Sequence, residues 1–296
     1  MDLQQMRYVV AVAETLNFTR AAERCMVVQS ALSHQMARLE KELGTRLFER
    51  TSKQVRLTPA GRAFLPAARE CLEAAERASA HVAAAIGEVR GRLAVGLIPT
   101  VAAVDIPAAL RDFRHRHPQV RIGLRVGASD DLVEQVREGS LEVAFLGTPT
   151  TFSPKGVSSQ KLAENRLVAV VPPSHPLAGE SAVDLAQLAG ETFIELPAGT
   201  AGRVQSDQAF TAAGIVRDIA FEVTTAEFMA RLVAEGLGVA MMPPSYVPYL
   251  TGVTAIEVNG APTRTEHVIW RSTGCTPAAS AFLSLLGIPH RLGSEP

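Results

Sequence analysis

The sequence predicts an α/β protein in three parts: a helical head, a single long helix, and a larger region in which strands and helices alternate. Residues 17–61 have the pattern of helix, turn, helix and basic hairpin. Residues 59–90 carry one apolar stripe with a period of about 3.5 residues. From residue 91 onward, short apolar runs alternate with helical patterns, as in parallel sheets covered on both faces. We therefore expect domains at 1–58, 59–90 and 91–296.

The head has the pattern of a winged helix-turn-helix. Asn17 or Thr19 can cap a short helix, and the small pair Ala21 and Ala22 allows a second helix to cross it closely. The second helix, over residues 29–43, has an apolar stripe formed by Leu32, Met36, Leu39 and Leu43. An ordinary helical core with solvated charges would not show helix, turn, helix and hairpin together in this order.

The opposite face of the second helix carries short polar side chains that suit base edges and phosphates. The charge is divided unevenly, since residues 1–58 hold nine Lys and Arg against six Asp and Glu, and the remainder holds 20 against 24. A basic head on an acidic body fits DNA binding at one end. The expected DNA contacts are Gln29, Ser30, Ser33, His34 and Arg38 on the helix, with Lys53 and Arg56 on the hairpin.

These motifs resemble the N-terminal domain of LysR-type transcriptional regulators. The resemblance is carried by MDLQQM at 1–6, FTRAAE at 18–23, VVQSALS at 27–33 and LGTRLFERTSKQVRLTPAG at 43–61, and more loosely by VVPPSHPL at 170–177 and LVAEGLGVAMMP at 232–243. Two positions depart from the family pattern: Val28 replaces the usual Ser or Thr, and Ser30 replaces Pro. Because the family residue at position 28 caps the recognition helix, its loss is expected to cost roughly 0.5–2 kcal/mol.

The segment over residues 59–90 is predicted to be one long helix. Thr58 supplies a capping hydroxyl, Pro59 takes the first helical position, and Pro66 lies in the first two turns. The stripe can pack on the chain's own body or on a second chain. Its small residues favour a second chain, and the resemblance implies a linker helix that dimerises the heads. The stripe includes Phe64, Ala68, Cys71, Ala75, Ala78 and Val82.

Four strand-to-helix junctions in the larger region carry hydroxyl side chains. Ligands of open parallel sheets bind beyond the carboxyl ends of strands, at helix N-termini that favour anions. Each hydroxyl alone can be a simple helix cap, but the recurrence of the pattern predicts a binding site. The expected ligand-contacting residues are Thr100 before a helix over 101–116, together with Ser129, Thr200 and Thr225. Arg203 can add a charge partner or can serve only at the surface.

The family resemblance implies two Rossmann-like lobes of the periplasmic-binding-protein type, separated by a hinged cleft. Lobe I would comprise 91–164 and 266–296, and lobe II 165–265. The implied function is a cytoplasmic, sequence-specific transcriptional regulator that binds double-stranded operator DNA of dyad symmetry as a homodimer or homotetramer. A small anionic metabolite in the cleft would act as effector.

Other classes of protein find little support in the sequence. The three cysteines lack metal-ligand spacing, and His115 and His117 fit a solvated helix end better than a metal site. We expect no metal, no cofactor and no enzymatic activity, because catalytic motifs are missing. No apolar run approaches the roughly 18 residues of a membrane span. A solute-binding protein of a transporter would share the two lobes, but the N-terminal winged helix argues against it.

Overall fold

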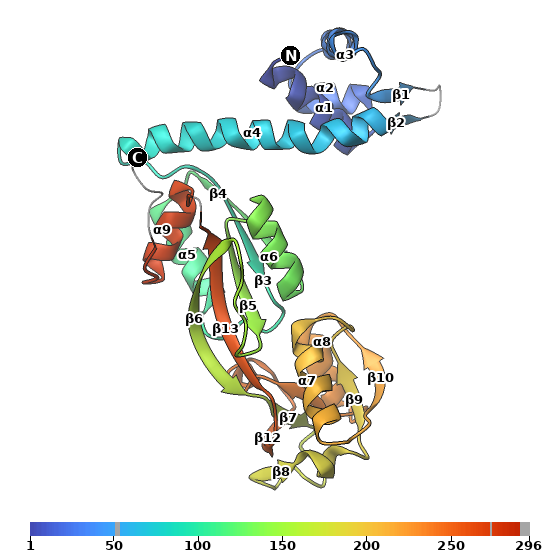
Figure 1. Ribbon diagram of the computed structural model, residues 1–296, viewed down its shortest axis with the longest axis vertical. Coiled ribbons are helices and arrows are strands. Elements are labelled where there is room, and N and C mark those ends of the chain that lie inside the picture. Colours follow the sequence, from blue (N-terminus) through green and yellow to red (C-terminus); the bar gives the residue numbers. More distant parts are fainter. Residues whose placement is uncertain (51–53, 273, 291–296) are drawn as a thin grey trace. The chain divides into compact units, whose positions relative to one another are not determined.

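The computed structural model describes residues 1–50, 54–272 and 274–290, and Lys53 lies outside them (Figure 1). The chain divides into two compact units, Met1–Glu88 and Val89–Pro296.

The first unit contains the predicted helix-turn-helix and the strands of its wing. Its elements are α1 (Leu3–Thr15), α2 (Phe18–Arg24), α3 (Gln29–Leu43), β1 (Phe48–Arg50), β2 (Val55–Leu57) and α4 (Pro59–Ala85). Asn17, rather than Thr19, caps α2, because its side-chain oxygen accepts from the N–H groups of Thr19 and Arg20 at 2.9 and 3.0 Å. The fully buried Leu32, Met36 and Leu39 join α3 to the core of the head.

Close contacts fix the wing against the helices. The carboxylate of Glu40 in α3 accepts from the N–H groups of Leu47 and Phe48, at 2.8 and 3.2 Å. Gly61 in α4 lies so close to the wing that a Cβ atom there would stand 2.1 Å from the carbonyl oxygen of Leu47. Backbone contact at this distance excludes a larger residue, which explains the final glycine of the LTPAG motif.

Helix α4 ends at Ala85, before the expected end at residue 90, because Gly87 adopts a left-handed conformation with φ of 84°. Pro66 lies inside the helix. The start of the predicted stripe packs on the chain's own head, since Ala68 is 1% exposed and Phe64 contacts the head core. Farther along the stripe, Cys71, Ala78 and Val82 are exposed.

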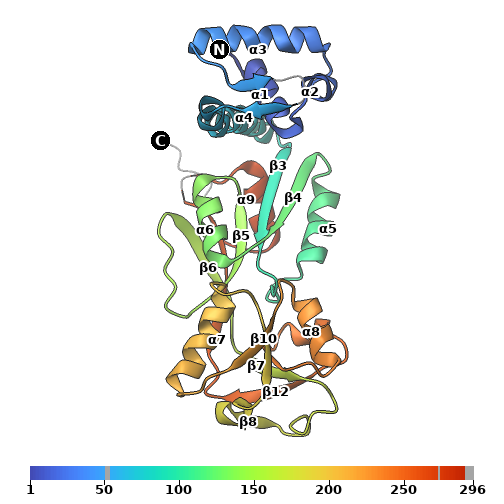
Figure 2. The same ribbon diagram turned by 90° about the vertical axis from the view of Figure 1, so that its right-hand side faces the viewer.

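Lobe I of the second unit is a five-stranded sheet with helices on both faces. The strand order is β4-β3-β5-β13-β6. The strands are β3 (Gly91–Leu97), β4 (Val120–Val126), β5 (Val143–Thr148), β6 (Val157–Arg166) and β13 (Thr263–Arg271). Helices α5 (Ile106–Arg116) and α9 (Pro277–Leu285) pack on one face, and α6 (Ser129–Glu138) packs on the other (Figure 2). Helix α5 begins later than the expected residue 101, because Asp105 rather than Thr100 caps it.

Lobe II contains a four-stranded sheet and a parallel pair of strands. The sheet order is β11-β7-β12-β8, formed by β7 (Val168–Val171), β8 (Ala182–Asp184), β11 (Ala240–Met242) and β12 (Thr254–Asn259). The pair is β9 (Thr192–Glu195) and β10 (Asp218–Glu222), which a bridge between Phe193 and Val239 joins to β11. Helices α7 (Ala201–Ala212) and α8 (Ala226–Ala234), with the short η1 (Leu185–Leu188) and η2 (Val247–Tyr249), complete the lobe.

The chain crosses between the lobes at slightly different points from those expected. Strands β6 and β13 pair antiparallel from Arg166 and Thr263 to Val157 and Arg271. Lobe I therefore extends to residue 166 and resumes at 263, rather than at 164 and 266. The same pairing makes its sheet mixed instead of parallel, because the returning strand runs against β5 as well.

Candidate functional site

The candidate DNA-binding surface is the polar face of α3. Gln29, Ser30, His34 and Arg38 are exposed and Ser33 is half-buried, whereas the opposite side of the helix is buried. The amide nitrogen of Gln29 donates to the hydroxyl of Ser33 at 2.8 Å, which holds these two side chains next to each other. Arg56, on the second wing strand, is also exposed. The helix thus presents hydrogen-bonding groups in a row, as a major-groove helix requires.

Among the described residues, no side chain caps the N-terminus of α3. Val28 occupies the cap position and is 69% exposed, and among the described residues no side chain bonds to the first-turn N–H groups. Ser30 therefore does not replace the missing cap. Unpaired N–H groups at a helix N-terminus attract phosphate oxygens, so this end of α3 is suited to contact a DNA backbone.

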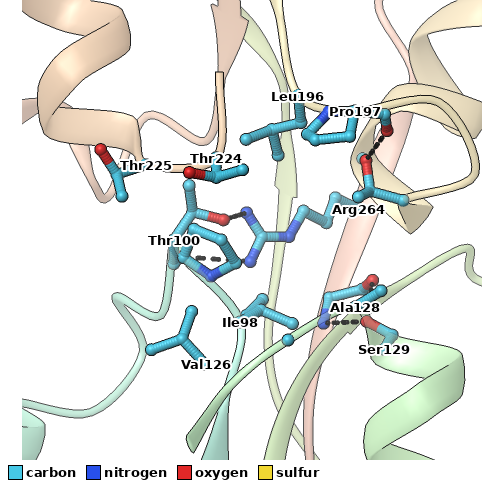
Figure 3. Close-up of a pocket in the computed structure, with 15 residues that line it drawn as sticks. Ile98, Thr100, Val126, Ala128, Ser129, Leu196, Pro197, Thr224, Thr225 and Arg264 are labelled. Carbon is cyan, nitrogen blue, oxygen red and sulfur yellow. Dashed lines mark hydrogen bonds between the residues drawn. The ribbon is translucent and has the colours of Figure 1, made fainter. Parts of the chain in front are cut away.

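A cavity of about 410 Å³ lies between the two lobes of the second unit. Thr100 follows β3, Ser129 begins α6, and Thr200 and Thr225 hold the cap positions of α7 and α8. All four line this cavity, so the structure brings these predicted residues together. Figure 3 shows Thr100, Ser129 and Thr225 around it. Much of the remaining wall is apolar and includes Ile98, Pro99, Val126, Leu196 and Pro197.

The four hydroxyl groups play different local roles. Thr225 acts as a helix cap and accepts from the N–H of Phe228 at 3.4 Å. Ser129 instead donates to the carbonyl of Gly147 at 3.1 Å, and Thr200 donates to the carbonyl of Pro197 at 2.9 Å. The cap position of α6 is Ala128, which has no side-chain acceptor, and the Thr200 hydroxyl does not cap α7, so within the described chain neither helix has a side-chain cap. Two helix N-termini, one from each lobe, keep their N–H groups open at the cavity.

Arg203 lies outside the cavity lining, unlike the other predicted ligand contacts. Its guanidinium bonds to Asp207 at 3.0 Å, to Glu222 at 3.2 Å and to the carbonyl of Leu196 at 3.3 Å. Glu222 also accepts from the N–H of Ala198 at 3.0 Å. These bonds tie the loop that carries Leu196 to strand β10. Arg203 therefore positions a wall of the cavity and is not directed at its interior.

Arg264 is the lining residue that sequence reasoning missed. It lies on β13, is 4% exposed, and donates to the hydroxyl of Thr100 at 2.8 Å and to its carbonyl at 3.1 Å. Burial lowers the pKa of this guanidinium, and Glu266, at 3.5 Å, opposes the change. The flat guanidinium fits because the neighbour on β5 is Gly147, where a Cβ would stand 2.4 Å from Nε of Arg264.

Glu266 links the same strand to the loop after β3. One of its oxygens accepts from the N–H groups of Ala102 and Ala103, at 3.1 and 3.0 Å. Arg264 and Glu266 are two residues apart in a strand, so both project to one face of the sheet. The opposite charges at alternate positions, in the TRTEHVIWR segment, are the local signal that the sequence offers for this pair.

Comparison with known proteins assigns both units. Residues 3–62 match the family "Bacterial regulatory helix-turn-helix protein, lysR family", and residues 87–287 match "LysR substrate binding domain". The chain belongs to the LysR family of transcriptional regulators. It is thus a DNA-binding regulator with a substrate-binding domain, and the proteins it resembles are regulators rather than enzymes.

This LysR-family protein resembles its relatives over nearly its whole length. It is 32% identical to the RuBisCO operon transcriptional regulator of Allochromatium vinosum, covering 95% of this chain and 94% of the relative. It is also 32% identical to the Hca operon transcriptional activator HcaR of Escherichia coli, covering 99% of each chain. The crystal structure of full-length CbnR complexed with its target DNA matches with a TM-score of 0.74 and 28% identity, over 97% of this chain and 99% of that one.

The helices and the metal-ligating side chains of the described residues bear on possible partners. None of the helices there has the length and apolar character needed to span a bilayer. Likewise, His, Cys, Asp and Glu side chains form no metal-binding cluster in the described ranges.

Proposed function

We propose that this regulator binds a small anionic metabolite in the interlobe cavity and thereby changes its binding to a dyad-symmetric operator in the cytoplasm. The observation that carries the proposal is the convergence of two open helix N-termini and a buried arginine on one cavity. Helix N-termini bind anions through free N–H groups and the helix dipole.

The charges around the cavity favour a single small anionic group. The charge of Arg264 is partly balanced by Glu266, and exposed Asp130 and Asp131 lie in the first turn of α6. These carboxylates would therefore repel a ligand group that carries a high negative charge. The apolar walls suit a hydrophobic body, so a monocarboxylate with an apolar part fits best.

Such a ligand would act by joining the lobes. Thr100 and Ser129 belong to lobe I, and Thr200 and Thr225 to lobe II. A ligand that contacts both sets stabilises one relative position of the lobes over others, and only such a difference in affinity can shift the protein's state.

For DNA, we propose that Gln29, Ser33 and His34 contact bases, while Arg56 and Lys53 of the wing contact the backbone or minor groove. The exposed part of the α4 stripe, including Cys71, Ala78 and Val82, would pair with a second chain. Two heads in a dimer or tetramer would then match the two half-sites of the operator.

The test is a thermal-shift screen of carboxylates made or used by the products of neighbouring genes, followed by comparison of each binding acid with its primary amide. We expect the amide to bind at least tenfold more weakly, and Thr200→Val, which keeps the side-chain shape, to weaken the acid as well. Equal binding of acid and amide would reject the anionic ligand.

A further inference from the structure

A small recess adjoins the cavity on the side of lobe II. Its volume is about 30 Å³, and it shares Thr100, Leu196, Gly202 and Arg264 with the cavity. A site of roughly 10–15 Å³ already holds one water molecule, so the recess has room for about two or three atoms of that size. It can therefore accept a single small substituent of a ligand whose body lies in the cavity.

The recess has one strong hydrogen-bond acceptor, Glu195. This residue ends β9 and is 3% exposed, yet it lines the recess. One carboxylate oxygen bonds to Arg217. The other oxygen has no hydrogen bond within the described part of the chain. Burial raises the pKa of the Glu195 carboxyl, and Arg217 opposes this change.

Arg217 holds Glu195 firmly in place. Its guanidinium also bonds to Asp207 and lies over the rings of Phe193 and Phe210, with distances of 5.2 and 4.5 Å to the ring centroids. Glu195 thus cannot swing away from the recess without breaking a buried, stacked ion pair. A carboxylate fixed in this way is suited to select a ligand group.

Among the other residues that line the recess, there is no second strong acceptor for a hydrogen-bond donor of the ligand. Met229, Met241 and Met242 are buried and apolar, and on the cavity side Arg264 is itself a donor. A methyl group in the recess would leave the free oxygen of Glu195 unpaired in a buried place, whereas a hydroxyl or amine would satisfy it. Sites built in this way discriminate strongly against ligands that lack the donor.

We propose that the recess between Glu195 and Arg264 selects, among small carboxylates, those that carry one hydroxyl or primary amine, which donates to Glu195. This inference rests on the proposed function of the cavity and names the ligand class more narrowly: a hydroxy or amino acid with an apolar body.

The experiment measures binding of matched probes to the full chain by isothermal titration calorimetry. Each set differs in one group: hexanoate, 5-hydroxypentanoate and 5-aminopentanoate form one, and 3- and 4-substituted methyl-, hydroxy- and aminobenzoates form two more. We expect the hydroxy or amino member of at least one set to bind tenfold or more tightly than the methyl member. Glu195→Gln, which keeps one oxygen but removes the charge, should reduce that preference about tenfold.

A second variant guards against a folding defect in Glu195→Gln. Gly202 also lines the recess, and a Cβ there would stand 3.7 Å from Leu196 Cδ1, an ordinary contact. Gly202→Ala should therefore narrow the recess without strain and lower the same preference at an unchanged melting temperature. Glu235→Gln, an exposed change elsewhere in lobe II, serves as the matched control.

The possible outcomes distinguish failure of the recess proposal from failure of the proposed anion site. Equal binding of methyl and hydroxy or amino members in every set would overturn the role of the recess and leave the anion site standing. Unchanged preference in both Glu195→Gln and Gly202→Ala would do the same. Failure of all the probes to bind would overturn the anion site and the recess together.

Discussion

Arg264 donates to both the hydroxyl and the carbonyl oxygen of Thr100, so the strand returning from lobe II and the loop after β3 are joined at the cavity. The hydroxyl of Thr100 accepts this bond, which leaves its own proton directed to another acceptor. If the cavity binds a carboxylate as proposed, Thr100 would donate to a ligand oxygen from a position that Arg264 fixes.

Gly147→Ala should disturb ligand binding while sparing the fold. The added Cβ would stand 2.4 Å from Nε of Arg264, and the guanidinium, as the far end of a long side chain, is the part that must move. We expect Arg264 to shift and the affinity for a carboxylate to fall at least tenfold. Calorimetry measures the affinity, with Gly179→Ala as control because nothing lies within 4 Å of its added Cβ. An unchanged carboxylate affinity in Gly147→Ala would show that the position of Arg264 does not affect ligand binding.

Val28→Ser should stabilise the head by supplying the cap that α3 lacks. A serine at this position can accept from a first-turn N–H, and such caps contribute about 0.5–2 kcal/mol. Thermal unfolding of the full chain should show a higher transition for the head. Met26→Ala, at another exposed position of the same turn, is the control. A lower transition in Val28→Ser would mean that the valine itself contributes to packing.

Gln29→Ala and Arg56→Ala should affect DNA binding in different ways. Loss of a base contact by Gln29 should reduce operator preference by about 1–3 kcal/mol and leave random DNA little changed. Loss of a phosphate contact by Arg56 should weaken binding to all sequences and reduce its salt dependence. Anisotropy titrations on operator and random duplexes at several salt concentrations distinguish the two, and equal loss on both duplexes for Gln29→Ala would contradict a base contact.

Ala78→Glu should weaken dimer formation through α4. The exposed Ala78 belongs to the part of the stripe that the head leaves uncovered, so the charge would meet its symmetry mate in a dry seam. Ser79→Glu places the same charge at the adjacent exposed position, off the stripe. Sedimentation should show dissociation for the first variant only. Identical profiles for both would place the interface elsewhere.

The thiols should differ sharply in reactivity. Burial raises the pKa of Cys275 to about 11 from 9.0, while Cys71 is exposed. Because only the thiolate reacts, iodoacetamide should modify Cys71 first and Cys275 only on unfolding. Because its pKa is raised, the Cys275 thiol holds its proton more tightly in the folded state than in the unfolded state. The stability that this proton contributes to the fold is fully present below pH 9 and is lost as the pH rises toward 11. Early labelling of Cys275 in the folded chain, followed by mass spectrometry, would contradict this.

Local patterns in the sequence were enough to predict the head and much of the cavity. Helix α3 follows from its apolar stripe and from Gly44, and the hydroxyls at Thr100, Ser129, Thr200 and Thr225 follow from strand-to-helix junctions. Strand β6 is a polar edge strand that lacks an apolar run, so its local sequence does not predict it. Arg264 was missed because its placement depends on pairing between segments more than a hundred residues apart. Arg203 was misplaced because its partners Glu222 and Asp207 decide where its side chain points.

The position of β13 inside the sheet of lobe I affects how the protein folds as it is synthesised. This strand lies between β5 and β6, and α9 covers the same core, yet both come after all of lobe II in the chain. The emerging chain must therefore hold lobe I unfinished, with the edges of β5 and β6 unpaired, while lobe II is made. Exposed strand edges are prone to association, and such distant pairing folds slowly. Truncation within the last thirty or so residues should for this reason disrupt the fold of lobe I, although the first strand of that lobe begins at residue 91.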